Sequence, residues 1–152
     1  MAHYPLNHHL RQPYRWLTAA SGLYLTLFGI LGIAFTWGDP FFHRGSDWVL
    51  GLRTNPAAAW LSTVLGLVVL AAALVGGNLH HRVNLVLGWG ILGVAMTLMA
   101  MIQTDANVLN VSMVNIIVLT VLGLFVLVGG LYGKVGSDEE SRHEREAGLL
   151  HG

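Results

Sequence analysis

Residues 85–132 read LVLGWGILGVAMTLMAMIQTDANVLNVSMVNIIVLTVLGLFVLVGGLY, and Asp105 is the only charged residue among them. Polar residues at 103–107 divide the stretch into two apolar runs, each suited to a helix of about 20 residues that crosses a hydrocarbon layer of about 30 Å. Backbone groups find no water in lipid, so a crossing segment must be a helix or part of a closed barrel. Neither run alternates as barrel strands do. The stretch therefore predicts a membrane hairpin of two helices.

The composition of the 152-residue chain agrees with this interpretation. Hydrophobic residues make up 54% and charged residues 11%, against roughly a quarter charged in soluble domains. A chain that is mostly spanning helix leaves no room for a separate catalytic domain of about 100 residues. The absence of cysteine excludes disulfides and thiolate chemistry. Eight scattered Lys and Arg residues and zero net charge do not indicate a nucleic-acid partner.

Two further apolar runs precede the hairpin. The first is too long for the core of a secretory signal, which has about 7 to 15 apolar residues, so we interpret it as a retained span. The sequence thus predicts an all-α integral membrane four-helix bundle at residues 17–133, with spans at about 17–37, 57–77, 85–102 and 112–132. A cytoplasmic head at 1–16 precedes the bundle. A charged cytoplasmic tail at 134–152 follows it, either as a frayed helix or disordered.

The distribution of Lys and Arg predicts the orientation. Cytoplasmic loops carry the excess of these residues. Both termini are predicted to be cytoplasmic, because six basic residues would then lie inside and two outside. The inside set is Arg11, Arg15, Arg82, Lys134, Arg142 and Arg145, and the outside set is Arg44 and Arg53.

Small residues recur at helical spacing in all four runs. The third carries Gly90, Gly93, Thr97 and Ala100, and the first carries Thr18, Gly22, Thr26 and Gly29. Small residues allow close helix contact in lipid, and we interpret the stripes as packing seams within the bundle rather than as a dimerisation face. The segment TVLGL occurs at 63–67 and again at 120–124, which suggests a tandem repeat of two helical hairpins.

Polar residues near the outer turns are the first group of candidate sites. Ionisable groups inside a membrane are functional candidates by default, and the predicted spans contain none. Asp105, Asn107 and Asn110 would turn or cap the hairpin at the outer rim. Asn115 lies about one turn into the fourth span and should hydrogen-bond a neighbouring helix.

The short connection between the second and third spans supplies the second group. His80, His81 and Arg82 would lie at the headgroups or on the cytoplasmic surface. A metal site that joins one of these histidines to the amino-terminal group is the alternative. No histidine falls inside a predicted span, which disfavours a haem held by two histidines. Without a recognisable catalytic arrangement or cofactor motif, we expect no enzyme activity, no cofactor and no metal.

Four turn segments are together similar to those of a known protein family: LGLRTN at 50–55, GNLHHRVN at 77–84, TDANVLN at 104–110 and GLYGKVG at 130–136. Together they resemble a family of small four-span membrane proteins that occurs mainly in actinobacteria and is catalogued as a domain of unknown function. The resemblance implies a bacterial plasma-membrane location and a four-helix fold, with no activity to carry over. It marks the turns at 53–55 and 104–107 as defining features. We expect Arg53, beside Thr54 and Asn55, to pair there with Asp105.

The sequence therefore predicts a non-catalytic multi-pass membrane protein that acts as a structural subunit, an assembly subunit or an accessory subunit. One alternative is a small transporter or channel whose mouth is the outer Asp/Asn rim. Another is a lipid- or quinone-binding subunit of a respiratory assembly. Membrane lipids are the expected partners, with another membrane protein or further copies of the chain as candidate protein partners.

Overall fold

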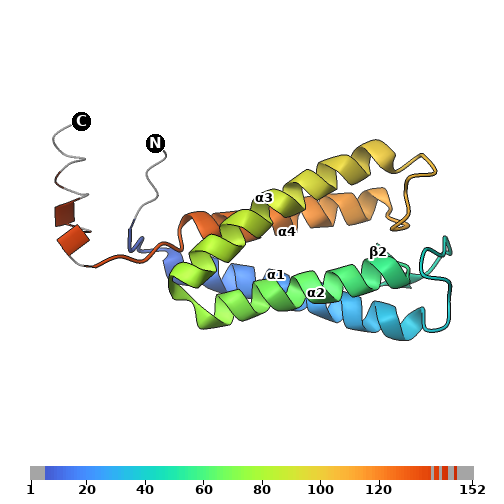
Figure 1. The fold of residues 1–152 in the computed structure, drawn as a ribbon, viewed down its shortest axis with the longest axis horizontal. Helices are drawn as coiled ribbons and strands as arrows, with labels where there is room; N and C mark the ends of the chain where they lie inside the picture. Colours follow the sequence, from blue (N-terminus) through green and yellow to red (C-terminus); the bar gives the residue numbers. More distant parts are fainter. Residues whose placement is uncertain (1–5, 138, 141, 144–145, 147–152) are drawn as a thin grey trace.

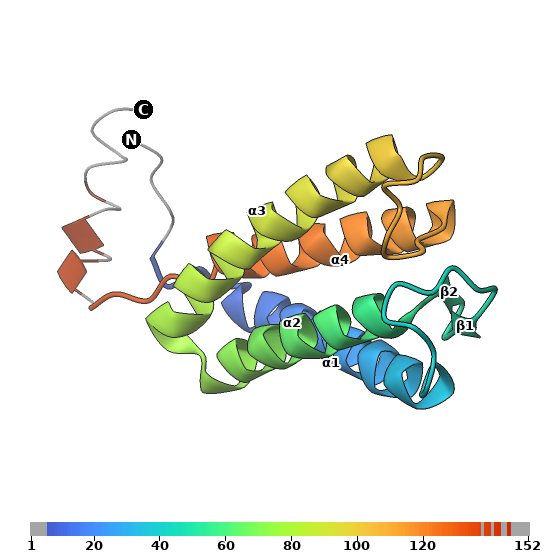
Figure 2. The ribbon, with the colours of Figure 1, turned by 45° about the vertical axis from the view of Figure 1, so that its right-hand side comes forward.

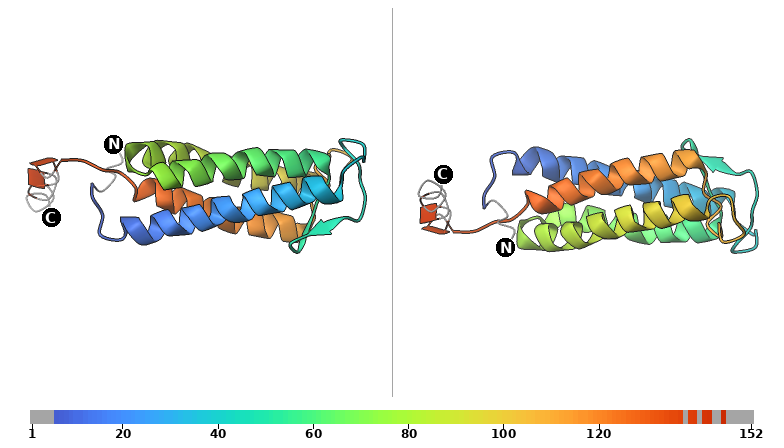
Figure 3. Two further views of the ribbon diagram at one scale, coloured as in Figure 1. Left: turned by 90° about the horizontal axis from the view of Figure 1, so that it is seen from below. Right: turned by 90° about the horizontal axis from the view of Figure 1, so that it is seen from above.

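The computed structural model describes residues 6–137, 139–140, 142–143 and 146. Within them the chain forms four long helices, which run side by side along one axis (Figures 1 and 3). Their bounds are α1 (Arg11–Phe35), α2 (Pro56–Val75), α3 (Gly77–Met101) and α4 (Met113–Leu131). A short antiparallel hairpin, β1 (Trp48–Val49) and β2 (Leu52–Arg53), lies in the connection between α1 and α2.

All four helices are long and apolar enough to cross a membrane. Their 19 to 25 residues correspond to about 28 to 38 Å at 1.5 Å per residue, which matches a bilayer core. Large apolar side chains remain exposed on every helix, among them Leu27, Leu74, Val86 and Ile117. Lipid can solvate such a surface, whereas water would not. The predicted all-α four-helix membrane fold is confirmed.

The predicted connection at residues 78–84 is wrong, because these residues form the first two turns of α3. Gly76 alone separates α2 from α3. Gly76 and Gly77 have φ values of +77° and +60°, which lets the chain reverse there. Hydropathy excluded the polar residues 78–84 from the span, although a helix that extends to the membrane boundary can carry them. The first helix likewise begins at Arg11, inside the predicted head.

The chain ends and the loops lie at opposite ends of the bundle. Residues 6–10 and 133–137 lie where α2 and α3 join, which we call the terminal end. Residues 36–55 and 102–112 lie at the other end, the loop end (Figure 1). The predictions for residues 1–5 and for most of the charged tail lie outside the described residues.

The helices pair closely as two hairpins, α1 with α2 and α3 with α4, through glycine. A Cβ atom on Gly22 would lie 2.7 Å from the backbone nitrogen of Leu70, and one on Gly88 would lie 2.5 Å from Cα of Leu127. The backbones can approach this closely only because no side chain intervenes. The predicted stripe on the first helix is a seam of this kind, since all of its members are buried: Thr18, Gly22, Thr26 and Gly29.

The corresponding prediction for the third helix is wrong. The stripe at Gly90, Gly93, Thr97 and Ala100, which we call the α3 stripe, is exposed along its whole length. A Cβ atom on either glycine would meet no atom within 4 Å. The opposite face of α3 is buried instead, at Gly88, Ile91, Ala95 and Leu98. Spacing identified a stripe but could not say which way it faces.

The two hairpins lean apart toward the loop end (Figure 2). They share one core cluster at Val69, Ile91 and Val126, which joins α2, α3 and α4. Nearer the loops the core divides into a cluster on β1, β2 and α1 and another on α3, α4 and their connection. Both hairpins use glycine seams, but this does not test the tandem repeat, which stays a prediction.

Two glycines on α3 provide a matched test of this packing. Gly88→Ala should lower the free energy of unfolding by about 1–3 kcal/mol, because the new methyl group overlaps the backbone of α4. Gly93→Ala should leave it unchanged or raise it by up to about 1 kcal/mol, since the methyl group meets open space and alanine favours the helix. Thermal unfolding in detergent would measure both. Equal losses would contradict the glycine-contact account.

Candidate functional site

Four buried asparagines organise the loop end. Asn55, Asn107, Asn110 and Asn115, which we call the asparagine cluster, are between 0% and 9% exposed. A buried carboxamide is costly unless its donors and acceptors are satisfied. Each of the four side chains hydrogen-bonds backbone groups, so the cluster links the turns of the loop end to one another.

Asn55 and Asn110 join the two long connections directly. The Asn55 side chain accepts a hydrogen bond from the Ala58 backbone at the start of α2 and donates to the carbonyl groups of His43 (3.1 Å) and Val108 (2.8 Å). Asn110 donates to the carbonyl groups of Gly45 and Thr54. The turn at 53–55 therefore meets the segment at 108–110, which directly follows the turn at 104–107 that was expected to meet it.

Asn115 makes its contacts with a strand and not with a neighbouring helix. Its amide donates to the carbonyl of Arg53 in β2 at 2.7 Å, and its oxygen accepts from the Arg53 backbone nitrogen at 3.0 Å. The same oxygen accepts from Ser112 in the capping box that starts α4. Asn107 bonds within its own connection, to Ile102 and Val111. The expected partner helix for Asn115 is thus replaced by β2.

The expected pairing of Arg53 with Asp105 is also replaced. Asp105 pairs with Arg44, whose Nη1 lies 3.2 Å from Oδ1, and Arg44 donates in addition to the Asp105 carbonyl. The carboxylate is fully exposed, and such pairs contribute little to stability. The Arg53 backbone hydrogen-bonds the Asn115 side chain. The Nε atom of Arg53 is buried without a hydrogen-bond partner among the described residues.

Sequence reasoning did not find a second feature of this end. Asp39, His43 and Asp47 bring three potential ligand atoms within 4.8 Å of one another. All three belong to the single connection between α1 and α2, where their spacing of four residues was a signal that could have been noticed. Asp39 and His43 are exposed. Exposed carboxylates often lie this close without an ion, so we assign no function to the group.

At the terminal end, the prediction that His80 and His81 are surface residues is wrong. Their exposed fractions are 2% and 9%, because they lie in the first turn of α3 and face the bundle. His81 Nδ1 hydrogen-bonds the Gly130 carbonyl at 2.7 Å, and His80 Nδ1 hydrogen-bonds Asn84. Arg82 is exposed, as predicted. The amino-terminal group, which the metal alternative requires, lies outside the described residues.

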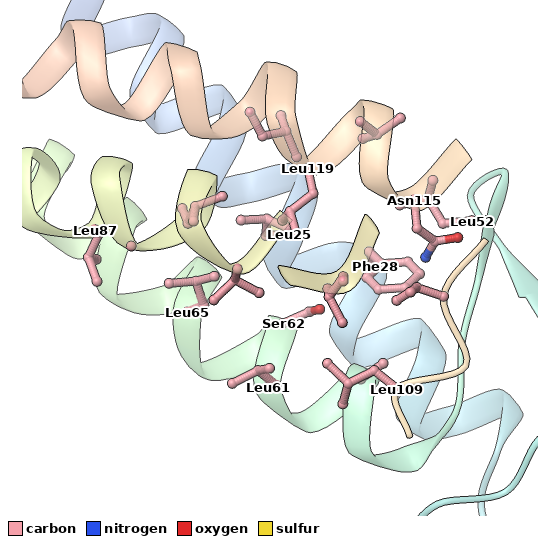
Figure 4. Close-up of a pocket in the computed structure, with 18 residues that line it drawn as sticks. Leu25, Phe28, Leu52, Leu61, Ser62, Leu65, Leu87, Leu109, Asn115 and Leu119 are labelled. Carbon is pink, nitrogen blue, oxygen red and sulfur yellow. The ribbon is translucent and has the colours of Figure 1, made fainter. Parts of the chain in front are cut away.

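An apolar groove of about 300 Å³ lies between the two hairpins. Figure 4 shows its long axis, with Leu87 at one end and Asn115 beside Leu52 at the other. The lining residues Leu61, Gly90 and Val94 are exposed, so the mouth lies between α2 and α3. Its polar lining residues are Ser62 and Asn115, and the Asn115 carboxamide is already bonded to Ser112 and Arg53.

The exposed face of α3 borders this groove, since Gly90 belongs to both. In its most apolar stretch α3 is 28% buried, whereas the corresponding stretches of the other helices are 39–44% buried. Groove and stripe together form a lateral surface of small and apolar groups. This surface lies within the predicted membrane layer.

Comparison with models of protein families, with curated proteins and with solved structures gives no match. The resemblance to the actinobacterial four-span family therefore stays a prediction.

The asparagine cluster can be tested against the exposed ion pair. Asn55→Ala should lower the free energy of unfolding by about 2–4 kcal/mol, because it removes the α2 cap and leaves two carbonyl groups without their partner. Asp105→Asn should leave the unfolding midpoint essentially unchanged, because water solvates both exposed partners. Denaturant titration in detergent would measure both. A larger loss of unfolding free energy in Asp105→Asn than in Asn55→Ala would mean that the ion pair, and not the asparagine cluster, stabilises the loop end.

Proposed function

We propose that the protein is a non-catalytic membrane subunit that joins a transmembrane helix of another membrane protein through the α3 stripe. The observation that carries the proposal is the exposure of that stripe. Small residues make few van der Waals contacts with lipid acyl chains. They let a second helix approach closely, however, and the two backbones then make many such contacts.

The other helices support this choice by contrast. Buried glycines on α1, α2 and α4 are already in contact with neighbouring backbone, as Gly22, Gly66 and Gly130 illustrate. On α3 a Cβ atom added to either glycine of the exposed stripe would meet no atom of a neighbouring described element within 4 Å. The Thr97 hydroxyl donates to the Gly93 carbonyl of its own helix, so the stripe presents a smooth surface without an unsatisfied hydroxyl donor.

The transporter alternative finds less support. Of the residues expected to form its mouth, Asn107 and Asn110 are bonded to backbone groups and Asp105 pairs with Arg44, which leaves them poorly placed to coordinate an ion. The groove that reaches toward the middle of the bundle has apolar walls. An ion there would lose its hydration without gaining ligands.

The groove favours a second candidate function, the binding of a lipid acyl chain. Its volume, its apolar lining and its mouth between two membrane helices suit a hydrocarbon chain that enters from the bilayer. A quinone would need donors for its carbonyl oxygens, and Ser62 is the one polar lining residue whose side chain makes no hydrogen bond within the described part of the chain. The groove therefore favours an acyl chain over a quinone.

For location, we propose the bacterial plasma membrane with both termini in the cytoplasm. Arg11, Arg15, Arg82 and Lys134 share the terminal end, whereas Arg44 and Arg53 belong to the loop end. This distribution supports the orientation under the rule that basic residues stay inside.

Because the chain lacks cysteine, single cysteines can test the partner helix. Ala100→Cys, alkylated with a photoactivatable maleimide, should cross-link to another membrane protein when native membranes are irradiated, since Ala100 belongs to the α3 stripe. Ala20→Cys, exposed on α1, is the matched control and should give little product. Adding Gly93→Leu should abolish the Ala100→Cys product, because the larger side chain keeps the partner helix away. Denaturing gels and mass spectrometry would identify the products. Cross-linking only between copies of this chain would contradict an accessory role.

The acyl-chain candidate has a separate test. Ser62→Phe should release lipid that the wild-type protein retains after detergent purification, because the ring fills the groove. Leu67→Phe, at an exposed position of α2 outside the groove, should retain it. Mass spectrometry of extracted lipid would compare the three proteins. Equal retention in all three would exclude the groove as the lipid site.

A further inference from the structure

A second pocket, of about 220 Å³, lies at the terminal end of the bundle. Arg11, Gln12 and Arg15 line it from α1, and Gly77 and His80 line it from the start of α3. None of the described residues that line it is acidic. The pocket therefore collects positive charge where α1 and α3 meet the polar boundary of the bundle.

Both arginines retain donors that no described residue accepts. Arg15 donates from Nε and Nη2 to the carbonyl groups of Ala73 and Leu74, which satisfies the end of α2 and leaves Nη1 without a hydrogen bond to a described residue. Arg11 donates from Nη1 to the Asn7 side chain. Neither guanidinium pairs with a carboxylate among the described residues.

His80 provides an independent observation that points to a ligand site. The residue is 2% exposed. Its Nδ1 lies 2.7 Å from the Asn84 amide nitrogen, which assigns Nδ1 as acceptor and Nε2 as the protonated nitrogen. Nε2 has no hydrogen-bond partner among the described residues. The Gly129 carbonyl lies close enough to the ring to interact with it electrostatically, but its geometry toward Nε2 is not that of a hydrogen bond. Nε2 lies beside Gly133, another lining residue.

The start of α3 adds backbone donors that the helix itself does not use. Gly76 precedes the helix, and no side chain caps it. The first N–H groups of a helix have no partner within the helix, and this end carries the positive pole of the dipole, which favours anions. The pocket therefore combines two cations, a buried imidazole donor and a helix start.

We propose that this pocket binds the phosphate group of a membrane phospholipid. A phosphate accepts several hydrogen bonds at once and suits arginine geometry. The location favours a lipid over a soluble phosphate, because Trp16, 64% exposed on α1 near the pocket residues in sequence, is of the kind that anchors at the headgroup layer. The site is independent of the α3 stripe, so either proposal can fail alone.

The test uses the delipidated full chain in a neutral detergent and native mass spectrometry. Three probes are compared: phosphatidylglycerol, diacylglycerol with the same chains, and inorganic phosphate. Phosphatidylglycerol should bind at least about tenfold more tightly than diacylglycerol, the change expected for one hydrogen bond to a charged group. Equal binding of the two lipids would overturn the proposal. If inorganic phosphate displaces phosphatidylglycerol at equal concentration, the site takes free phosphate, which would overturn the lipid assignment.

Variants then locate the site. Arg11→Gln with Gln12→Ala should weaken phosphatidylglycerol binding about tenfold. Both side chains are exposed in the first turn of α1, and an unchanged thermal midpoint in detergent would verify the fold. Arg82→Gln removes an exposed arginine from the same end of α3 but outside the pocket, and should bind as the wild type does. An equal loss in Arg82→Gln would mean general charge attraction and would overturn the proposal.

Discussion

Direct contact between backbones at glycine is the interaction on which the rest of this structure depends. Lipid chains are as apolar as leucine, so burying leucine between helices gains little over leaving it in the bilayer. Helices in lipid gain van der Waals contacts when their backbones approach closely. Gly22 allows this between α1 and α2, and Gly88 allows it between α3 and α4. The bundle is consequently two tight hairpins that meet along a shorter shared core.

This arrangement leaves two lateral features unfilled. The hairpins lean apart at the loop end, and the groove lies between them with Gly90 at its mouth. Beside it, the face of α3 that carries Gly93 is exposed, and a Cβ atom added there would meet no atom of the described residues within 4 Å. Both follow from the position of the seams, because a helix that uses one face for its hairpin partner presents the other to the membrane.

The two ends of the bundle are held by different chemistry. At the loop end the carboxamides of Asn55 and Asn110 bind carbonyl groups of distant turns, so the long connections have defined positions. At the terminal end Arg15 satisfies the last carbonyls of α2. His80 there is buried with a donor still unused. At the loop end the four asparagine side chains are satisfied by the fold, whereas the terminal end retains polar groups in a pocket that a ligand can satisfy.

The sequence alone determined the membrane location, the number of helices and the approximate positions of α2 and α4, because these depend on the length of apolar runs and on the need to satisfy backbone groups in lipid. It also pointed to the turns at 53–55 and 104–107, although the contacts form with the adjacent residues Val108 and Asn110. Only the tertiary structure decided the start of α3 and the burial of His80, since hydropathy places a helix end where apolarity ends and not where hydrogen bonding ends. The short hairpin β1–β2 and the pairing of Arg44 with Asp105 depend on contacts between distant segments. The outward direction of the α3 stripe was likewise undetermined, because helical spacing defines which residues share a face, and only the neighbouring helices decide which face is covered.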